Sequence, residues 1–155
     1  MLAYVGKMFI VPAVKDLCDS GLRYWWQLII QHTGGNRQIW KRKIYTSYRP
    51  VLVFAKEPVR PAPRWVFESV RGGGRDKRFH EWGQDVDETT AWIEGFTDPN
   101  DLIVDPFVGG GTVPMVCLAT KRSWIGTEID PKNAAAARSR LDGERRRSRM
   151  GTSAT

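Results

Sequence analysis

Two short stretches in the last third of the sequence carry residues suited to binding a ligand. The first runs from Asp105 to Thr112 as Asp-Pro-Phe-Val-Gly-Gly-Gly-Thr, and the second contains Glu128, 17 residues after Gly111. Glycines allow a backbone to approach a ligand closely because they lack a Cβ. A carboxylate at this spacing can accept hydrogen bonds from both hydroxyls of a ribose. Together the two stretches predict a site for a nucleoside-containing ligand.

The residues around these stretches predict the elements that position them. The succession is helix, strand, glycine turn, helix, strand, helix, which indicates a parallel, right-handed βαβ unit with helices on both faces of the sheet. In such sheets ligands bind beyond the carboxyl ends of the strands, where both stretches lie. The expected elements are a helix over Val86–Phe96, a strand over Leu102–Asp105, a helix from Thr112, a strand over Ser123–Glu128 and a helix from Pro131 to Leu141.

The first half of the sequence is less regular. Apolar runs bounded by glycine or proline predict strands over Leu2–Val5, Tyr24–Ile30 and Val51–Ala55, with a helix over Pro12–Leu22. The many prolines, glycines and arginines between Glu57 and Gly83 predict a long loop. A loop of that length inside a compact domain is usually functional or disordered.

Composition excludes several classes of protein. The chain has 155 residues, which suffice for a hydrophobic core, and it has no apolar run long enough to cross a membrane. Cys18 and Cys117 are far apart and form no Cys-x-x-Cys motif, so neither a disulfide framework nor a metal site is expected. We therefore expect a protein of the reducing cytoplasm rather than a membrane protein, a secreted mini-protein or a zinc finger.

The net charge of +7 is unevenly distributed. Residues 37–78 carry 12 Lys and Arg against 3 Asp and Glu, whereas residues 79–137 carry 3 against 10. A basic segment interspersed with aromatic residues is typical of a surface that binds nucleic acid, although it also fits a solvated basic face. Within this segment we expect Arg42, Arg60, Arg71 and Arg75 to contact the nucleic acid, which the family resemblance given below implies is double-stranded DNA.

The stretch Asp101–Leu141 resembles the S-adenosylmethionine-binding half of DNA amino-methyltransferases, which modify adenine N6 or cytosine N4. The family's pattern is Asp-Pro-Phe-x-Gly-x-Gly-Thr followed by Gly-x-Glu-x-Asp, and the second part stands here at Gly126–Asp130. The resemblance implies an α/β, Rossmann-like methyltransferase fold with a mostly parallel sheet. It also implies that S-adenosylmethionine is bound by Asp105, Pro106, Phe107, Gly109, Gly111, Thr112, Glu128 and Asp130.

The resemblance extends upstream to Leu2. The block Asp76–Gln84 is similar to the His-x-Trp-Gly-Gln variant of phage-associated methyltransferases, which implies cofactor contact by His80, Trp82 and Gln84. The domain expected on this basis spans residues 1–141, with a basic target-recognition region at 37–84 and a cofactor-binding unit at 101–141. Residues 142–155 are expected to be a disordered Arg-rich tail.

One motif of the family is missing, and its absence limits what can be expected of catalysis. The family holds the target amino group with an Asp-Pro-Pro-Tyr motif, and none of the three Asp-Pro pairs here continues in that way. We therefore name no catalytic residue and expect the fold to be incomplete at its N-terminus. The sheet would lack the strand between Leu102–Asp105 and Leu2–Val5.

These observations leave several functions open. The favoured one is an S-adenosylmethionine-dependent DNA methyltransferase of a bacterium or phage-infected host, of the kind found in restriction-modification, in a truncated form or completed by a separate chain. The alternative is a catalytically inactive remnant that binds DNA or the cofactor. A nicotinamide-dependent Rossmann enzyme is disfavoured because the turn is not Gly-x-Gly-x-x-Gly.

Overall fold

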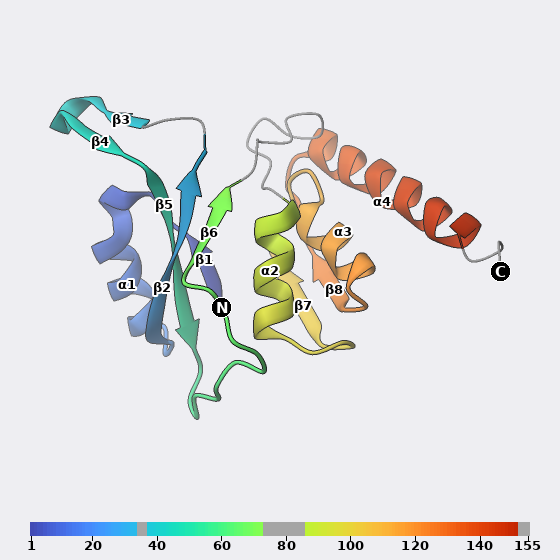
Figure 1. The fold of residues 1–155 in the computed structure, drawn as a ribbon, viewed down its shortest axis with the longest axis horizontal. Coiled ribbons are helices and arrows are strands. Elements are labelled where there is room, and N and C mark those ends of the chain that lie inside the picture. The colour runs from blue at the N-terminus through green and yellow to red at the C-terminus, as the bar shows by residue number, and fades with distance from the viewer. Residues whose placement is uncertain (34–36, 73–85, 152–155) are drawn as a thin grey trace. The chain divides into compact units, whose positions relative to one another are not determined.

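The computed structural model describes residues 1–33, 37–72 and 86–151, with side chains described as far as Arg146. The chain divides into two compact units, Met1–Gly74 and Arg75–Thr155 (Figure 1). The expectation of a single domain over residues 1–141 stays a prediction. His80, Trp82, Gln84 and Arg75 of the predicted sites lie outside the described residues.

A four-stranded sheet forms the centre of the first unit. Its order is β1 (Leu2–Tyr4), β5 (Tyr48–Ala55), β2 (Arg23–His32) and β6 (Ser69–Gly72). β5 runs antiparallel to both neighbours, and β6 is parallel to β2. β5 is central because its continuous apolar run is buried on both faces, and Val51–Phe54 pack there with Leu28 and Ile30. β6 lies within the predicted loop; its four residues offer no apolar run that marks a strand.

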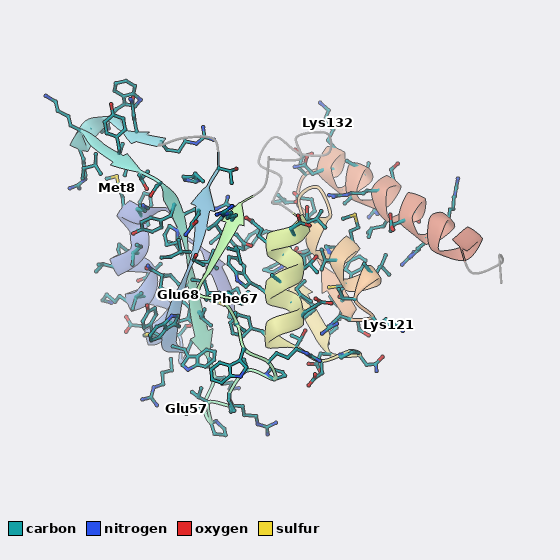
Figure 2. All side chains as sticks on the ribbon, viewed as in Figure 1. Met8, Glu57, Phe67, Glu68, Lys121 and Lys132 are labelled. Atoms are coloured by element: carbon teal, nitrogen blue, oxygen red, sulfur yellow. The ribbon has the colours of Figure 1, made fainter. Side chains whose placement is uncertain are left out.

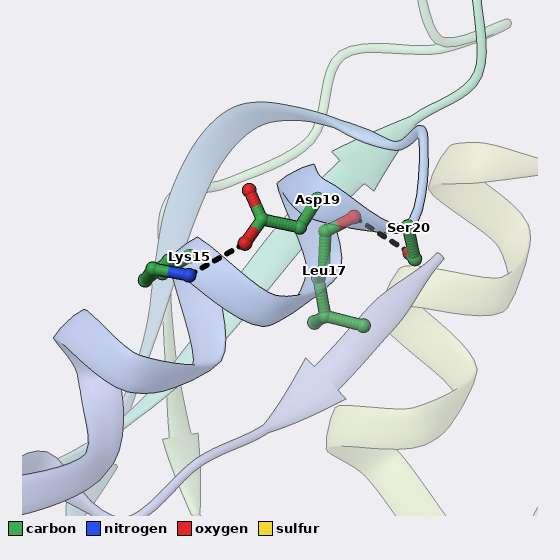
Figure 3. Close-up of polar contacts among 4 residues, drawn as sticks. All are labelled: Lys15, Leu17, Asp19 and Ser20. Atoms are coloured by element: carbon green, nitrogen blue, oxygen red, sulfur yellow. Dashed lines mark hydrogen bonds and ion pairs between the residues drawn. The ribbon is translucent and has the colours of Figure 1, made fainter.

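Helix α1 (Ile10–Asp19) follows a short 3₁₀ turn, η1 (Lys7–Phe9). It starts two residues before the predicted Pro12, which lies in its first turn, where a missing N–H costs nothing. Gly21, at φ +90°, ends the helix: its N–H donates to Cys18 O at 3.0 Å, and Leu22 N–H donates to Leu17 O at 3.2 Å. The last turn also carries the Lys15–Asp19 pair at 2.6 Å and the Ser20 hydroxyl bond to Leu17 O at 2.7 Å (Figure 3).

A two-stranded antiparallel hairpin forms a second, separate sheet in the first unit. It consists of β3 (Arg37–Ile39), a 3₁₀ turn η2 (Trp40–Arg42) and β4 (Ile44–Thr46). Figure 1 shows it as an arm that extends beyond the ends of β2 and β5. We refer to residues 37–46 as the basic hairpin.

The second unit contains the predicted parallel βαβ arrangement, and the α/β fold class is confirmed. Its elements are α2 (Val86–Phe96), β7 (Leu102–Asp105), α3 (Thr112–Ala119), β8 (Ser123–Gly126) and α4 (Pro131–Gly151). β7 and β8 pair in parallel from Leu102↔Ser123 to Asp105↔Gly126. Ile93, Val116 and Cys117 form the core, against which Ile103 and Trp124 pack. Among the described strands, β7 pairs with β8 alone and β1 with β5 alone, so none of them bridges these two strands.

Helix α4 continues ten residues beyond Leu141, into the segment expected to be a disordered tail. The residues that follow Leu141 include Glu144, Arg145 and Arg146, which have high helix propensity, and no proline interrupts them. An exposed pair between Asp142 and Arg145 at 3.9 Å adds a small contribution. In the described part of the chain, no helix is both long and apolar enough to cross a membrane.

Candidate functional site

The turn between β7 and α3 has a left-handed backbone conformation that favours glycine. Gly109 and Gly111 have φ of +52° and +80°, and Gly111 N–H donates to Val108 O at 2.9 Å. A Cβ on Gly111 would lie 3.1 Å from Cβ of Ala137 on α4. The positive φ angles favour glycine at both positions, and the nearness of Ala137 leaves little room for a side chain at Gly111. The turn therefore carries no side chain at these positions and packs tightly against α4.

Glu128 joins the end of β8 to this turn. Its Oε2 accepts the Gly109 N–H at 2.8 Å and its Oε1 accepts the Asp130 N–H at 2.9 Å. The backbone bonds from Asp130 and Gly109 stabilise the anion and lower the pKa of Glu128 below its ordinary value. The carboxylate is therefore charged, fixed in direction and still has free lone pairs on both oxygens.

The ends of the two strands are also joined directly. Val108 N–H donates to Thr127 O at 3.0 Å, and Thr127 N–H donates to Asp105 O at 3.1 Å. Gly126 permits this approach, since a Cβ there would lie 2.3 Å from Cγ2 of Val108 and 3.0 Å from Asp105 O. The glycine turn and Glu128 are thus held together by their own backbones.

Asp105 is the last residue of β7, and its pKa is shifted in the opposite direction to that of Glu128. Its Oδ1 accepts the Phe107 N–H at 3.0 Å, which favours the anion. Burial outweighs this bond and raises the pKa of Asp105, and the nearby charge of Glu128 raises it further. Two carboxylates with pKa values shifted in opposite directions are a common feature of ligand sites, although structural networks also produce them.

Arg140 of α4 supports the turn from its other side. Its Nη1 donates to Gly110 O at 3.1 Å and to the Thr112 hydroxyl at 3.2 Å. The sequence suggested no role for Arg140. A signal is present in hindsight: Ala137 and Arg140 are three residues apart, and therefore lie on one face of α4, where one is small and the other can donate several hydrogen bonds.

The structure brings most of the predicted cofactor residues together, in three different settings. Phe107 is 85% exposed beside the turn, and Pro106 is also exposed. Thr112 is buried and bonded to Arg140, so it faces inward. Asp130 caps α4, with its Oδ1 accepting the Lys132 N–H at 2.7 Å. The glycine turn, Glu128 and Phe107 form the candidate site. Thr112 and Asp130 support the backbone around it.

The predicted DNA-contacting arginines that the structure describes lie in the first unit. Arg42 is in η2, Arg71 is in β6 and Arg60 is in the loop between β5 and β6. All three are exposed. Their side chains are accessible to a polyanion, but they lie on separate segments.

Part of the chain matches a known protein family. The family model described as DNA methylase matches residues 65–139, which include the glycine turn and Glu128. We refer to residues 65–139, which match this family model, as the DNA methylase segment. Asp105, the glycine turn and Glu128 all lie within this segment.

A relative and two solved structures extend the comparison. Type II methyltransferase M.XycI of Xanthomonas campestris pv. cyanopsidis is 40% identical over 52 residues, which are 34% of this chain and 17% of the relative. The M1.HpyAVI–SAM complex is 20% identical with a TM-score of 0.76, over 91% of this chain and 73% of that one. PvuII DNA methyltransferase (cytosine-N4-specific) is 18% identical with a TM-score of 0.72, over 90% and 61%. The chain therefore has the α/β fold of these two structures. Its match to M.XycI spans about a sixth of the length of that relative.

Proposed function

We propose that the second unit binds S-adenosylmethionine and that the protein serves methyl transfer to an exocyclic amino group of adenine or cytosine in DNA. The single observation that carries the proposal is the Glu128 carboxylate bonded to the Gly109 N–H of a left-handed glycine turn, inside the DNA methylase segment. The M1.HpyAVI structure, whose fold this chain shares, is a complex with this cofactor.

The residues present fit the proposed cofactor. Glu128 is held as an anion at the end of β8 and has lone pairs available for two ribose hydroxyls. Gly109 and Gly111 remove the side chains that would otherwise fill the turn, and Phe107 offers an exposed aromatic face beside it. Bound there, S-adenosylmethionine supplies an electrophilic methyl group. His80, Trp82 and Gln84 are proposed as further contacts on the basis of the sequence pattern alone.

None of the three Asp-Pro pairs continues as the acceptor motif that holds a target amino group in the family. Asp105 accepts the Phe107 N–H, Asp130 caps α4, and Asp98 belongs to the turn before β7, where its N–H donates to Asp101 at 2.8 Å. We propose that these acceptors come from a further strand, on the same polypeptide or on a separate chain. A protein that binds cofactor or DNA without catalysis is the second candidate, and this same observation favours it.

DNA is the proposed substrate, and the first unit is its proposed binding region. Residues 1–74 carry 12 Lys and Arg against 4 Asp and Glu, and Arg42, Arg60 and Arg71 are exposed. Arg75 is proposed with them from the sequence. The bacterial origin of M.XycI supports a bacterial cytoplasm as the place of action.

Calorimetric titration separates the proposed cofactor from its competitor. The full chain should bind S-adenosylmethionine saturably at one site and should not bind a nicotinamide dinucleotide. Selective binding of the nicotinamide would overturn the proposal. Incorporation of labelled methyl groups into unmethylated DNA then separates an active methyltransferase from the second candidate, which would bind the cofactor and transfer nothing.

A further inference from the structure

The second unit carries two regions of opposite charge. Residues 79–137 contain 3 Lys and Arg against 10 Asp and Glu, whereas residues 138–151, which complete α4, contain 6 against 2. The family model ends at residue 139. The match to the DNA methylase family therefore implies nothing about the role of most of this basic part of α4.

The basic part of α4 packs on little of its own unit. Among the described side chains of α4, Leu141 is the last that is buried, and the sequence from Asp142 to Gly151 contains Met150 as its single apolar side chain. Such a helix has no apolar face for a hydrophobic groove or a membrane, so a partner has to recognise its charge. Since α4 is one continuous helix that extends beyond α3 in Figure 1, its basic end cannot fold back on the acidic part of its own unit.

An exposed stripe runs along this part of α4 and consists of Arg138, Asp142 and Arg145, which we call the α4 stripe. The spacing of four and then three residues places them on one face of the helix. Arg145 lies 3.9 Å from Asp142, but their side chains are 56% and 64% exposed, so this contact contributes little. No ion pair involves Arg138 among the described residues. Both guanidinium groups are therefore accessible to carboxylates of another molecule.

Helix α2 has a matching stripe of opposite charge, which we call the α2 stripe. Asp87, Ala91 and Glu94 are exposed and have the same spacing, whereas Trp92 and Ile93 are buried. The two carboxylates of the α2 stripe are seven residues apart, and so are the two arginines of the α4 stripe. Seven residues correspond to about 10 Å along a helix. The charges of the two stripes therefore have the same period.

The two stripes complement each other when their helices lie side by side and parallel. Arg138 then lies opposite Asp87, and Arg145 lies opposite Glu94. Asp142, the one acid of the α4 stripe, lies opposite the alanine of the α2 stripe and meets no like charge. The small alanine side chain also allows the two helices to approach closely. Every charge in this alignment faces an opposite charge or a neutral residue.

We infer that the α4 stripe docks on the α2 stripe of a second copy of this chain, and that the two copies do so reciprocally. Helix α3 contacts both α2 and α4, so a two-fold axis beside α3 brings α2 of each copy to α4 of the other. The basic end of α4, which cannot reach the acidic part of its own unit, thereby meets the acidic surface of an identical unit. Neither stripe contains a residue of the candidate site, so the inference does not depend on the proposed function.

The test measures self-association of the full chain by sedimentation velocity over a range of protein concentrations. The wild type should form a reversible dimer whose dissociation constant rises at least roughly tenfold between about 0.05 M and about 0.5 M salt, because screening weakens exposed ion pairs. The R138E/R145E variant and the D87K/E94K variant should each raise the dissociation constant at least roughly tenfold at low salt, because like charges then face each other. Circular dichroism checks that both variants fold.

A mixture of the two variants gives the sharpest outcome. In a heterodimer, the acidic α4 stripe of one variant faces the basic α2 stripe of the other, and the two remaining stripes keep their original charges. The mixture should therefore form a heterodimer with an affinity close to that of the wild-type dimer. A mixture without heterodimer would overturn the inference. A wild-type chain that stays monomeric at low salt, or variants that associate as the wild type does, would overturn it as well.

A matched control reverses two charges elsewhere. The K41E/K121E variant changes exposed lysines in η2 and in the turn after α3, where Lys121 is labelled in Figure 2. It should dimerise like the wild type, and an equal loss in this control would contradict the inference because net charge would then control association. If a double variant does not fold, Arg145→Glu, at an exposed position, should still raise the dissociation constant at least about threefold.

Discussion

The glycine turn of the second unit and the basic hairpin of the first use polar groups in opposite ways. At the turn, Glu128 is bonded to two backbone N–H groups and Arg140 to Gly110 O, so the polar groups position one another. At the hairpin, Lys41, Arg42 and Lys43 have no carboxylate partner among the described residues. A small ligand is held best by groups that are already oriented, whereas a polyanion is held by charges that remain free.

The distribution of charge follows the same division. The first unit carries 12 Lys and Arg against 4 Asp and Glu, and the second carries 12 against 13. The whole positive excess of the chain therefore belongs to the unit with the hairpin. The predictions below challenge the preorganisation of the turn, which is one side of the comparison, from the largest expected effect to the smallest.

Gly126→Val should have the largest effect on the fold of the second unit. Its side chain would collide with Val108 and with the backbone of Asp105, and overpacking of this kind costs about 3 kcal/mol of unfolding free energy. Urea denaturation followed by circular dichroism measures the loss. Gly143→Ala is the matched control, since a Cβ there meets nothing within 4 Å, and it should be neutral or stabilise α4 by up to about 1 kcal/mol. Equal stability of both variants would show that the strand ends are not tightly joined.

Glu128→Ala should weaken S-adenosylmethionine binding on the order of a hundredfold, because it removes the charged acceptor for the ribose and releases the Gly109 N–H. Glu128→Gln should lie between Ala and wild type, since the amide offers a single acceptor oxygen. Calorimetry measures the affinities, and circular dichroism checks the fold. Wild-type affinity in the Ala variant would remove Glu128 from the site.

Arg140→Ala should weaken cofactor binding about tenfold through the turn rather than by direct contact. Arg140→Lys should recover part of the loss, because one ammonium can reach either Gly110 O or the Thr112 hydroxyl with less fixed geometry. The readout is again the cofactor dissociation constant. A positioning role predicts this partial rescue, and identical affinities for the Lys and Ala variants would argue against it.

Asp105→Asn tests the electrostatics of the turn and should have the smallest effect. Burial raises the pKa of Asp105, so the folded chain holds this proton more tightly than the unfolded chain does. The carboxyl group therefore lowers the free energy of unfolding as the pH rises above 3.8, the ordinary pKa of an aspartate. The Asn variant should be more stable than wild type at pH 7 and should lose this difference toward pH 3. Denaturation at both pH values measures it, and a difference that grows toward pH 3 would have the wrong sign.

Much of this arrangement follows from local sequence, and the parts that do not have physical causes. Local sequence predicts the strand Leu102–Asp105, the glycine turn and the helix from Thr112. The apolar run, the glycines and the capping pattern all indicate the same elements there. β6 is not, since Ser69–Gly72 becomes a strand only by pairing with β2, a partner about 40 residues away. Helix α4 extends to Gly151, beyond the predicted limit at Leu141, because the residues that follow have a helix propensity that an Arg-rich composition does not reveal.

The same contrast holds for individual site residues. Glu128 was predicted because its spacing from the glycines reflects a chemical requirement of a ribose. Its bond to Gly109 N–H was not, because the bond depends on how closely β7 and β8 approach, which Gly126 decides sterically. Arg140 was missed as a turn contact because its partners lie about 30 residues away in the chain.

Titration of the full chain with S-adenosylmethionine, compared with Glu128→Ala under the same conditions, tests the central claim most directly. The account predicts saturable binding at one site in the wild type and a loss on the order of a hundredfold in the folded variant. Equal affinities in the two proteins, or no binding by a folded wild type, would contradict it.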